Sequence, residues 1–152
     1  MVNEIDLEID LVEINDQVFL AVLEGDNEVP PVETDAFGDA IFFINGEGEL
    51  EFEIIVVDID NVTAAHIHLG QPGENGPVVA TLFTGAFSTT DPNVPETLVT
   101  GVITDEDLQG PLAGQTVEAL LAQMEAGNTY TNVNTTEFPG GEIRGQNEFV
   151  NP

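Results

Sequence analysis

The chain has 152 residues, no cysteine, and 29 acidic residues against one basic residue, which gives a formal net charge of −28. This length fits one domain with a hydrophobic core, and the charge excludes nucleic acid and anionic lipid surfaces as partners. The lack of cysteine excludes disulfides, thiolate metal sites and a cysteine nucleophile, and no apolar run is long enough for membrane insertion.

The negative charge needs screening by salt or neutralisation by bound cations. A saline or calcium-rich extracellular setting accounts for it, and so does simple solubility at high ionic strength. The N-terminal residues lack the basic region and the apolar core of a signal peptide. The protein therefore either stays inside the cell or has lost its signal; we expect the second, and hence a secreted protein.

The first predicted element lies at residues 4–11, where acidic and apolar side chains alternate strictly. The apolar face consists of Ile5, Leu7, Ile9 and Leu11. The alternation shifts by one residue at Val12, which predicts a bulge or a break. We therefore expect an N-terminal extra strand at residues 1–15 and a β-sandwich domain at 16–152. The strand either pairs within its own domain or is an assembly strand donated to a neighbouring subunit's sheet.

The rest of the chain alternates short apolar runs with clusters of Gly, Pro and Asn. The runs predict strands at residues 17–23, 40–44, 49–57, 62–70, 78–83, 98–103, 130–135 and 142–146. One helix is predicted over residues 116–126, with Thr116 as its N-cap and Gly127 as its stop. A single helical turn is predicted at residues 104–108. Many short strands with one short helix are typical of an all-β, antiparallel sandwich or barrel.

Both histidines of the chain lie in the strand predicted at residues 62–70. A strand places alternate residues on one face, so His66 and His68 form a pair that can chelate a metal if a third ligand lies nearby. Asn134 or a carboxylate is the candidate third ligand, and copper or zinc is the candidate metal. In the structural alternative, both imidazoles make hydrogen bonds to backbone or to polar side chains.

Calcium is the other candidate ion, because several turns carry clustered oxygen ligands. These turns are Asp58–Asn61, Asp105–Asp107 and Glu24–Asp26. None matches an EF-hand loop, so they predict loose binding at most. No phosphate-binding glycine loop, nucleophile elbow or catalytic triad is present, which indicates a protein that is not an enzyme.

Four segments together resemble the CHRD domain family, which is named from chordin and occurs in many extracellular proteins. They lie at residues 27–31, 65–70, 127–135 and 138–145, and the resemblance covers residues 17–148. It implies an immunoglobulin-like or Cu/Zn-superoxide-dismutase-like Greek-key sandwich that is usually secreted. Where the family usually reads Asn-Val-His-Thr, this chain has Asn134 in place of the histidine, so a family metal site would lack its third ligand here. The dismutase metal centre uses six histidines, and two cannot build it.

Arg144 is the only basic residue, and we expect it to be structural. It is predicted to be partly buried in a bidentate pair with a carboxylate. Glu142 lies beside it on the same strand, and the resemblance brings the segment of Glu28 close to it.

These observations predict a non-catalytic extracellular structural or interaction module. Its expected partners are further copies of itself, in a matrix or filament built by β-strand donation, or other extracellular proteins. The alternative is a copper- or zinc-binding protein that uses His66 and His68.

Overall fold

The computed structural model describes residues 17–150, which form nine strands. Their bounds are β1 Val18–Glu24, β2 Phe37–Ile44, β3 Leu50–Val57, β4 Val62–Leu69, β5 Val78–Phe87, β6 Glu96–Ile103, β7 Thr129–Thr135, β8 Ile143–Gln146 and β9 Glu148–Val150. Eight of them correspond to the strands predicted after residue 16, and β9 was not predicted. The extra strand predicted at residues 1–15, with Ile5, Leu7, Ile9 and Leu11, lies outside the described residues.

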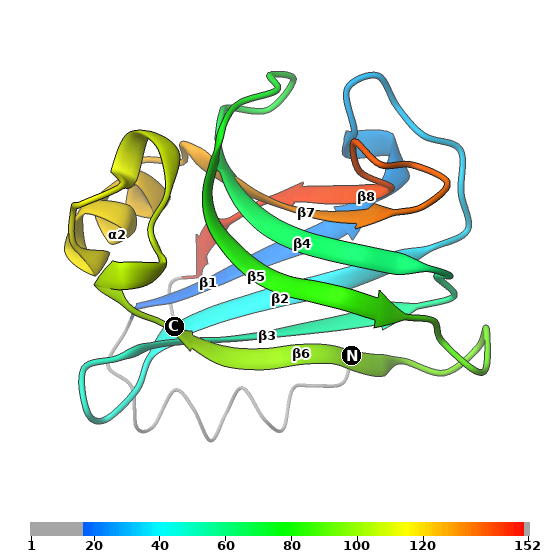
Figure 1. Ribbon diagram of the computed structural model, residues 1–152, viewed down its shortest axis with the longest axis horizontal. Helices are drawn as coiled ribbons and strands as arrows, with labels where there is room; N and C mark the ends of the chain where they lie inside the picture. Colours follow the sequence, from blue (N-terminus) through cyan, green and yellow to red (C-terminus); the bar gives the residue numbers. More distant parts are fainter. Residues whose placement is uncertain (1–16, 151–152) are drawn as a thin grey trace.

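The strands of the described part form one antiparallel sheet in the order β5-β4-β7-β8-β1-β2-β3-β6, with β9 paired to β1. The sheet folds back on itself, so that β4, β5 and β7 lie across the core from β1, β2 and β3 (Figure 1). One half of the sheet consists of β5, β4, β7 and β8, and the other of β1, β2, β3 and β6. The chain crosses from one half to the other after β3, β5 and β6, and these crossings are Greek-key connections. The predicted all-β Greek-key sandwich with one short helix is therefore confirmed.

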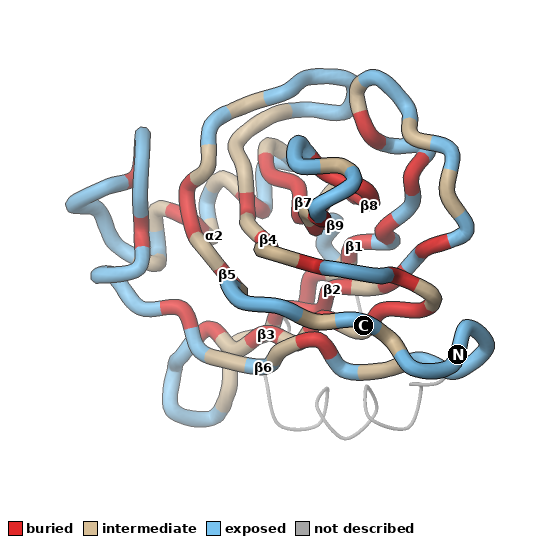
Figure 2. Tube along the Cα trace, turned by 45° about the vertical axis from the view of Figure 1, so that its right-hand side comes forward, coloured by how far each residue is buried: buried red, intermediate tan, exposed pale blue. Residues whose placement is uncertain are grey.

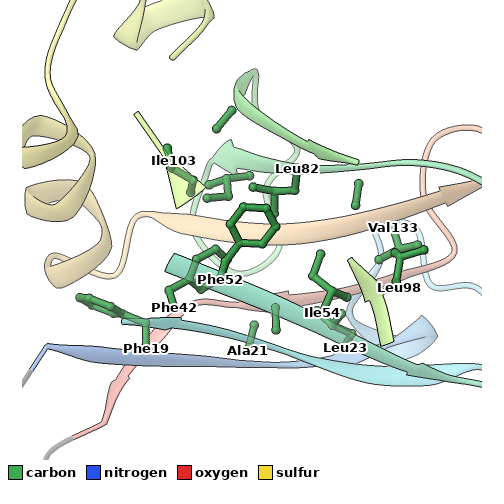
Figure 3. Close-up of a cluster of buried hydrophobic side chains, with 14 of the residues drawn as sticks. Phe19, Ala21, Leu23, Phe42, Phe52, Ile54, Leu82, Leu98, Ile103 and Val133 are labelled. Atoms are coloured by element: carbon green, nitrogen blue, oxygen red, sulfur yellow. The ribbon is translucent and has the colours of Figure 1, made fainter. Parts of the chain in front are cut away.

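The core lies between the two halves and takes one face of each strand, as period-two alternation requires. In β3, alternation places Leu50, Phe52, Ile54 and Val56 on the inward face, and all four are buried. Figure 3 shows Phe52 surrounded by side chains from β2, β5 and β6. Burying one such side chain stabilises the fold by about 1.5–3 kcal/mol.

Helix α2, Val117–Glu125, connects β6 to β7 and covers one end of the sandwich (Figure 1). The Thr116 hydroxyl accepts a hydrogen bond from the Ala119 N–H, and Leu120 and Met124 are buried. The described part also contains three single 3₁₀ turns, η1 Gly25–Asn27, η2 Asp105–Asp107 and η3 Gly110–Leu112. The second of these confirms the helical turn predicted at residues 104–108. Within residues 17–150, no helix is long and apolar enough to cross a membrane.

Two long loops, residues 25–36 and 70–77, border the half of the sheet that contains β4, β7 and β8. Residues 71–75 of the second loop are exposed, whereas most positions of β7 and β8 are buried (Figure 2). The Asn75 side-chain amide donates a hydrogen bond to the Val29 carbonyl oxygen at 2.9 Å, so the two loops are joined. On the outward face of these strands, Tyr130, Asn132 and Arg144 are buried although they point away from the hydrophobic core, and His66 and His68 are partly buried.

Candidate functional site

The candidate site is the polar cluster on the outward face of β4, β7 and β8. The antiparallel register pairs His68 with Tyr130, His66 with Asn132, and Asn132 with Arg144. Alternation on each strand therefore brings these five side chains to one face. Alternation in residues 130–135 places Tyr130, Asn132 and Asn134 on one face, and the chain's single tyrosine is the sequence signal for the centre of the cluster.

A stacked column of His68, Tyr130 and Arg144 forms the middle of this cluster. The rings of His68 and Tyr130 are parallel within 5°, with centroids 4.7 Å apart. The guanidinium carbon of Arg144 lies 3.5 Å from the centre of the Tyr130 ring, a cation–π contact. Only 2% of the Arg144 surface is exposed, which gives the contact its strength because water competes little for the charge.

Arg144 and Tyr130 also hold the 70–77 loop over the strands. The guanidinium donates one hydrogen bond to the Asn75 side-chain oxygen at 2.9 Å and another to the Glu74 carbonyl oxygen. The Tyr130 hydroxyl oxygen accepts a hydrogen bond from the Gly76 N–H at 3.1 Å. The lone arginine therefore fixes a loop through backbone and amide oxygens, partners that sequence periodicity does not indicate.

Two carboxylates are buried close to Arg144. Glu142 accepts hydrogen bonds from the hydroxyls of Thr34, at 2.6 Å, and Thr135, at 2.9 Å. For Glu28, burial raises the pKa to about 7; the Arg144 charge acts against this rise and the Glu142 charge adds to it. The charge of Arg144 thus acts on Glu28, while its hydrogen bonds go to Asn75 and Glu74. The bidentate pair of Arg144 with Glu28 or Glu142 stays a prediction.

Each histidine has its Nδ1 held by an oxygen. His66 Nδ1 lies 3.2 Å from Asn134 Oδ1, and His68 Nδ1 lies 2.8 Å from the Gly76 carbonyl oxygen. The Asn134 amide nitrogen donates to Pro139, which turns its oxygen towards His66. Because these oxygens only accept hydrogen bonds, Nδ1 is the donor in both rings, and neutral imidazole then carries its lone pair on Nε2.

Burial lowers the pKa of both imidazoles, which favours the neutral form. The hydrogen bonds that the rings donate to the Asn134 and Gly76 oxygens oppose this lowering, and for His68 the charges of His66 and Arg144 add to it. The two ring centroids lie 5.8 Å apart. Asn134 thus orients His66 in the way that outer partners orient metal-ligating histidines.

At one of the three turns proposed for calcium, Asp105–Asp107, two carboxylates are engaged in local structure. Asp107 accepts hydrogen bonds from the N–H and hydroxyl of Thr104, and Asp105 accepts one from the Val117 N–H. Across residues 17–150, no group of three or more His, Cys, Asp or Glu side chains has the arrangement of a metal site. In this part of the chain, the histidine pair therefore has no third His, Cys, Asp or Glu side chain placed as a ligand.

Comparison with known proteins gives one match. The model of the CHRD domain family matches residues 19–147, which is most of the chain. The matched range includes the whole polar cluster, from His66 to Arg144, and also Glu28. No curated protein and no solved structure matches the chain.

Proposed function

The chain belongs to the CHRD domain family, and we propose that it is a secreted, non-catalytic module that acts by binding other protein chains. Membership supports an extracellular interaction module in general. The polar cluster supports the same reading, because Arg144, Tyr130 and Glu142 are engaged in holding loops in place. The partners are then bound by strand edges and loops, which is how sandwich domains commonly recognise other chains.

We further propose that the module associates with copies of itself by strand donation to the free edge of β6. In the described part, β5 and β6 are the two ends of the sheet. The β5 edge is partly occupied, because Ala80 forms a bridge with Leu108 and the Val79 carbonyl oxygen accepts from Gln109. Among residues 17–150, β6 pairs with β3 alone, so its other edge presents unpaired backbone groups to a partner strand.

Residues 4–11 suit this edge in length and in charge. The segment has eight residues, as β6 has. On the outward face of the sheet, Thr100 of β6 pairs with Glu53 of β3, and Val102 pairs with Glu51. An added strand's acidic face would therefore lie next to uncharged side chains rather than directly against glutamates, which lowers the like-charge repulsion.

We expect full-length protein to form assemblies larger than a monomer in 0.5 M NaCl, and protein lacking residues 1–14 to stay monomeric. The salt screens the repulsion between copies. Light scattering on both forms, with and without millimolar calcium, makes the measurement. Leu7→Asp should abolish assembly because it places a charge on the apolar face, whereas the matched Asp6→Asn change on the polar face should leave it intact. A full-length monomer under all these conditions contradicts strand donation.

Copper or zinc binding by His66 and His68 is a second candidate function, and the fixed Nδ1 atoms favour it. With both Nδ1–H groups donating to oxygens, the free lone pairs are on the two Nε2 atoms. His68 Nε2 is buried and has no hydrogen-bond partner among the described residues. A site of this kind needs further ligands, which water or a second chain can supply.

For this second candidate, we expect one copper or zinc ion per chain after loading and desalting, measured by elemental analysis. His66→Ala and His68→Ala should each remove the ion. Asn134→Ala should weaken binding by about 10–100-fold, the usual effect of losing an orienting partner. Metal content that is equal in the wild type and the double histidine variant means that the ions are bound by surface carboxylates, and this candidate is then wrong.

A further inference from the structure

Two buried oxygen atoms face the same small space beside Gly141, and neither has a hydrogen-bond donor. They are Glu28 Oε2 and Asn132 Oδ1, and neither has a partner among the described residues. A methyl group at Gly141 would lie 2.6 Å from the first and 2.3 Å from the second. Glu28 is 6% exposed and Asn132 is 3% exposed, so the surroundings of both are largely dry.

The orientation of Asn132 is fixed by its own amide nitrogen. Asn132 Nδ2 donates a hydrogen bond to the Gly140 carbonyl oxygen at 3.0 Å. Turning the amide over would place two oxygens against each other at Gly140, so Oδ1 stays on the side of Glu28. An ionised carboxylate has no hydrogen to offer, so both buried acceptors stay without a donor, which destabilises this arrangement.

Protonation of Glu28 supplies the missing hydrogen-bond donor. A carboxyl group protonated on Oε2 is a donor, and the amide oxygen of Asn132 is the acceptor beside it. We propose that Glu28 and Asn132 form a proton-operated latch, in which protonated Glu28 donates a hydrogen bond to Asn132 Oδ1 and ionised Glu28 releases it. The proton exchanges with solvent, and no other bond forms or breaks.

The latch joins two loops that are distant in sequence. Glu28 lies at the start of the loop that continues through Val29–Val32, and Asn132 lies in β7 beside the turn at Phe138–Gly141. Glu28 and the residues of both segments, Val29–Val32 and Phe138–Gly141, line an open hollow on the surface. Release of Glu28 should loosen the walls of this hollow, so the latch makes this part of the binding surface sensitive to pH. This inference does not depend on strand donation.

The charged groups that face Glu28 decide the pH at which the latch opens. They are Arg144, whose charge lowers the pKa of Glu28, and Glu142, whose charge raises it. Burial exceeds both effects and raises this pKa from 4.5 to about 7. The folded protein therefore binds the proton more tightly than the unfolded chain does. The contribution of protonated Glu28 to the stability of the fold is complete below pH 4.5 and is lost as the pH rises to about 7.

The test is a pH titration of the whole chain by NMR, which follows the side-chain carboxyl carbon of Glu28 and the side-chain amide of Asn132. The Glu28 signal is assigned by its absence in Glu28→Gln. We expect both groups to titrate with one shared midpoint near pH 7. In Glu28→Gln, whose amide can donate to Asn132 at every pH, the Asn132 signal should be independent of pH.

Amide exchange reports the loosening of the loops. The amides of Val32 and Gly141 donate to Gly25 and Phe138, one in each loop. At pH 5.5, these two amides should exchange equally fast in the wild type and in Glu28→Gln. At pH 8.5, they should exchange about 10-fold faster in the wild type. Glu47→Gln, in the distant β2–β3 turn, removes one charge elsewhere and should change nothing. A Glu28 midpoint near 4.5, or an Asn132 amide that does not follow Glu28, overturns the proposal.

Discussion

Replacing Arg144 with methionine is expected to lower the free energy of unfolding by about 3–5 kcal/mol, measured by urea denaturation at pH 7. Methionine fills much of the same volume, so the loss comes from the charge and the hydrogen bonds. The change removes the cation from the Tyr130 ring and leaves the Asn75 and Glu74 oxygens without their donor. It also removes the positive charge that partly offsets the burial of the Glu28 carboxyl group.

A double variant separates these contributions. In Arg144→Met, the pKa of Glu28 should rise further, because the Arg144 charge lowers it in the wild type. At a pH above this raised pKa, Glu28 is an uncompensated carboxylate, and Glu28→Gln in the same chain should then recover about 1–2 kcal/mol, which is a coupling between neighbours. Arg144→Lys keeps the charge but loses the planar group, and should fall between the wild type and Arg144→Met. Equal stability of Arg144→Met and the wild type contradicts the role given to the stacked column.

Replacing Gly141 with alanine is expected to destabilise the fold by about 2–4 kcal/mol, from backbone strain and overpacking together. Gly141 has φ +129°, which L side chains rarely adopt. Its new methyl group would lie 2.3 Å from Asn132 Oδ1 and 2.6 Å from Glu28 Oε2. Both neighbours are buried and cannot move away without losing other contacts. Thermal unfolding followed by circular dichroism gives the measurement.

The adjacent glycine provides the matched control. A methyl group at Gly140 would meet nothing within 4 Å, and we expect Gly140→Ala to change stability by no more than about 0.5 kcal/mol. The two variants add the same group one residue apart in the same turn. A similar loss in both would mean that the turn itself, rather than the space between Glu28 and Asn132, sets the effect.

Much of the fold could be predicted from the sequence because strand and helix signals are local. The alternation in residues 49–57 places Leu50, Phe52 and Ile54 inside, and the structure buries all three. The helix was predictable from Thr116, Gly127 and the spacing between them. The short strand β9 was missed, since three residues carry too little alternation, and it forms only because β1 presents an open edge at residues 18–20.

The candidate site was less predictable, for a physical reason. Alternation tells which face a residue occupies, so His66 and His68 could be placed together, as could Tyr130 and Asn132. It does not tell whether a loop covers that face, because Gly- and Pro-rich loops have no periodicity. Arg144 was predicted to be partly buried, and 2% of its surface is exposed. Its actual hydrogen-bond partners are the Asn75 side chain and a carbonyl oxygen in residues 70–77, positions that nothing in the sequence links to it.

The burial of Arg144 has a consequence for the outside of the molecule. The chain's only basic side chain is enclosed, so the surface of the described part carries acidic groups with no fixed cation among them. Each copy must therefore bring a cloud of mobile cations from solution. When two copies meet, their clouds are compressed into the contact and further cations are drawn in. The association constant should then rise with salt concentration, opposite in sign to the release of counterions that drives proteins onto DNA. Cations from solution are therefore taken up when two copies associate.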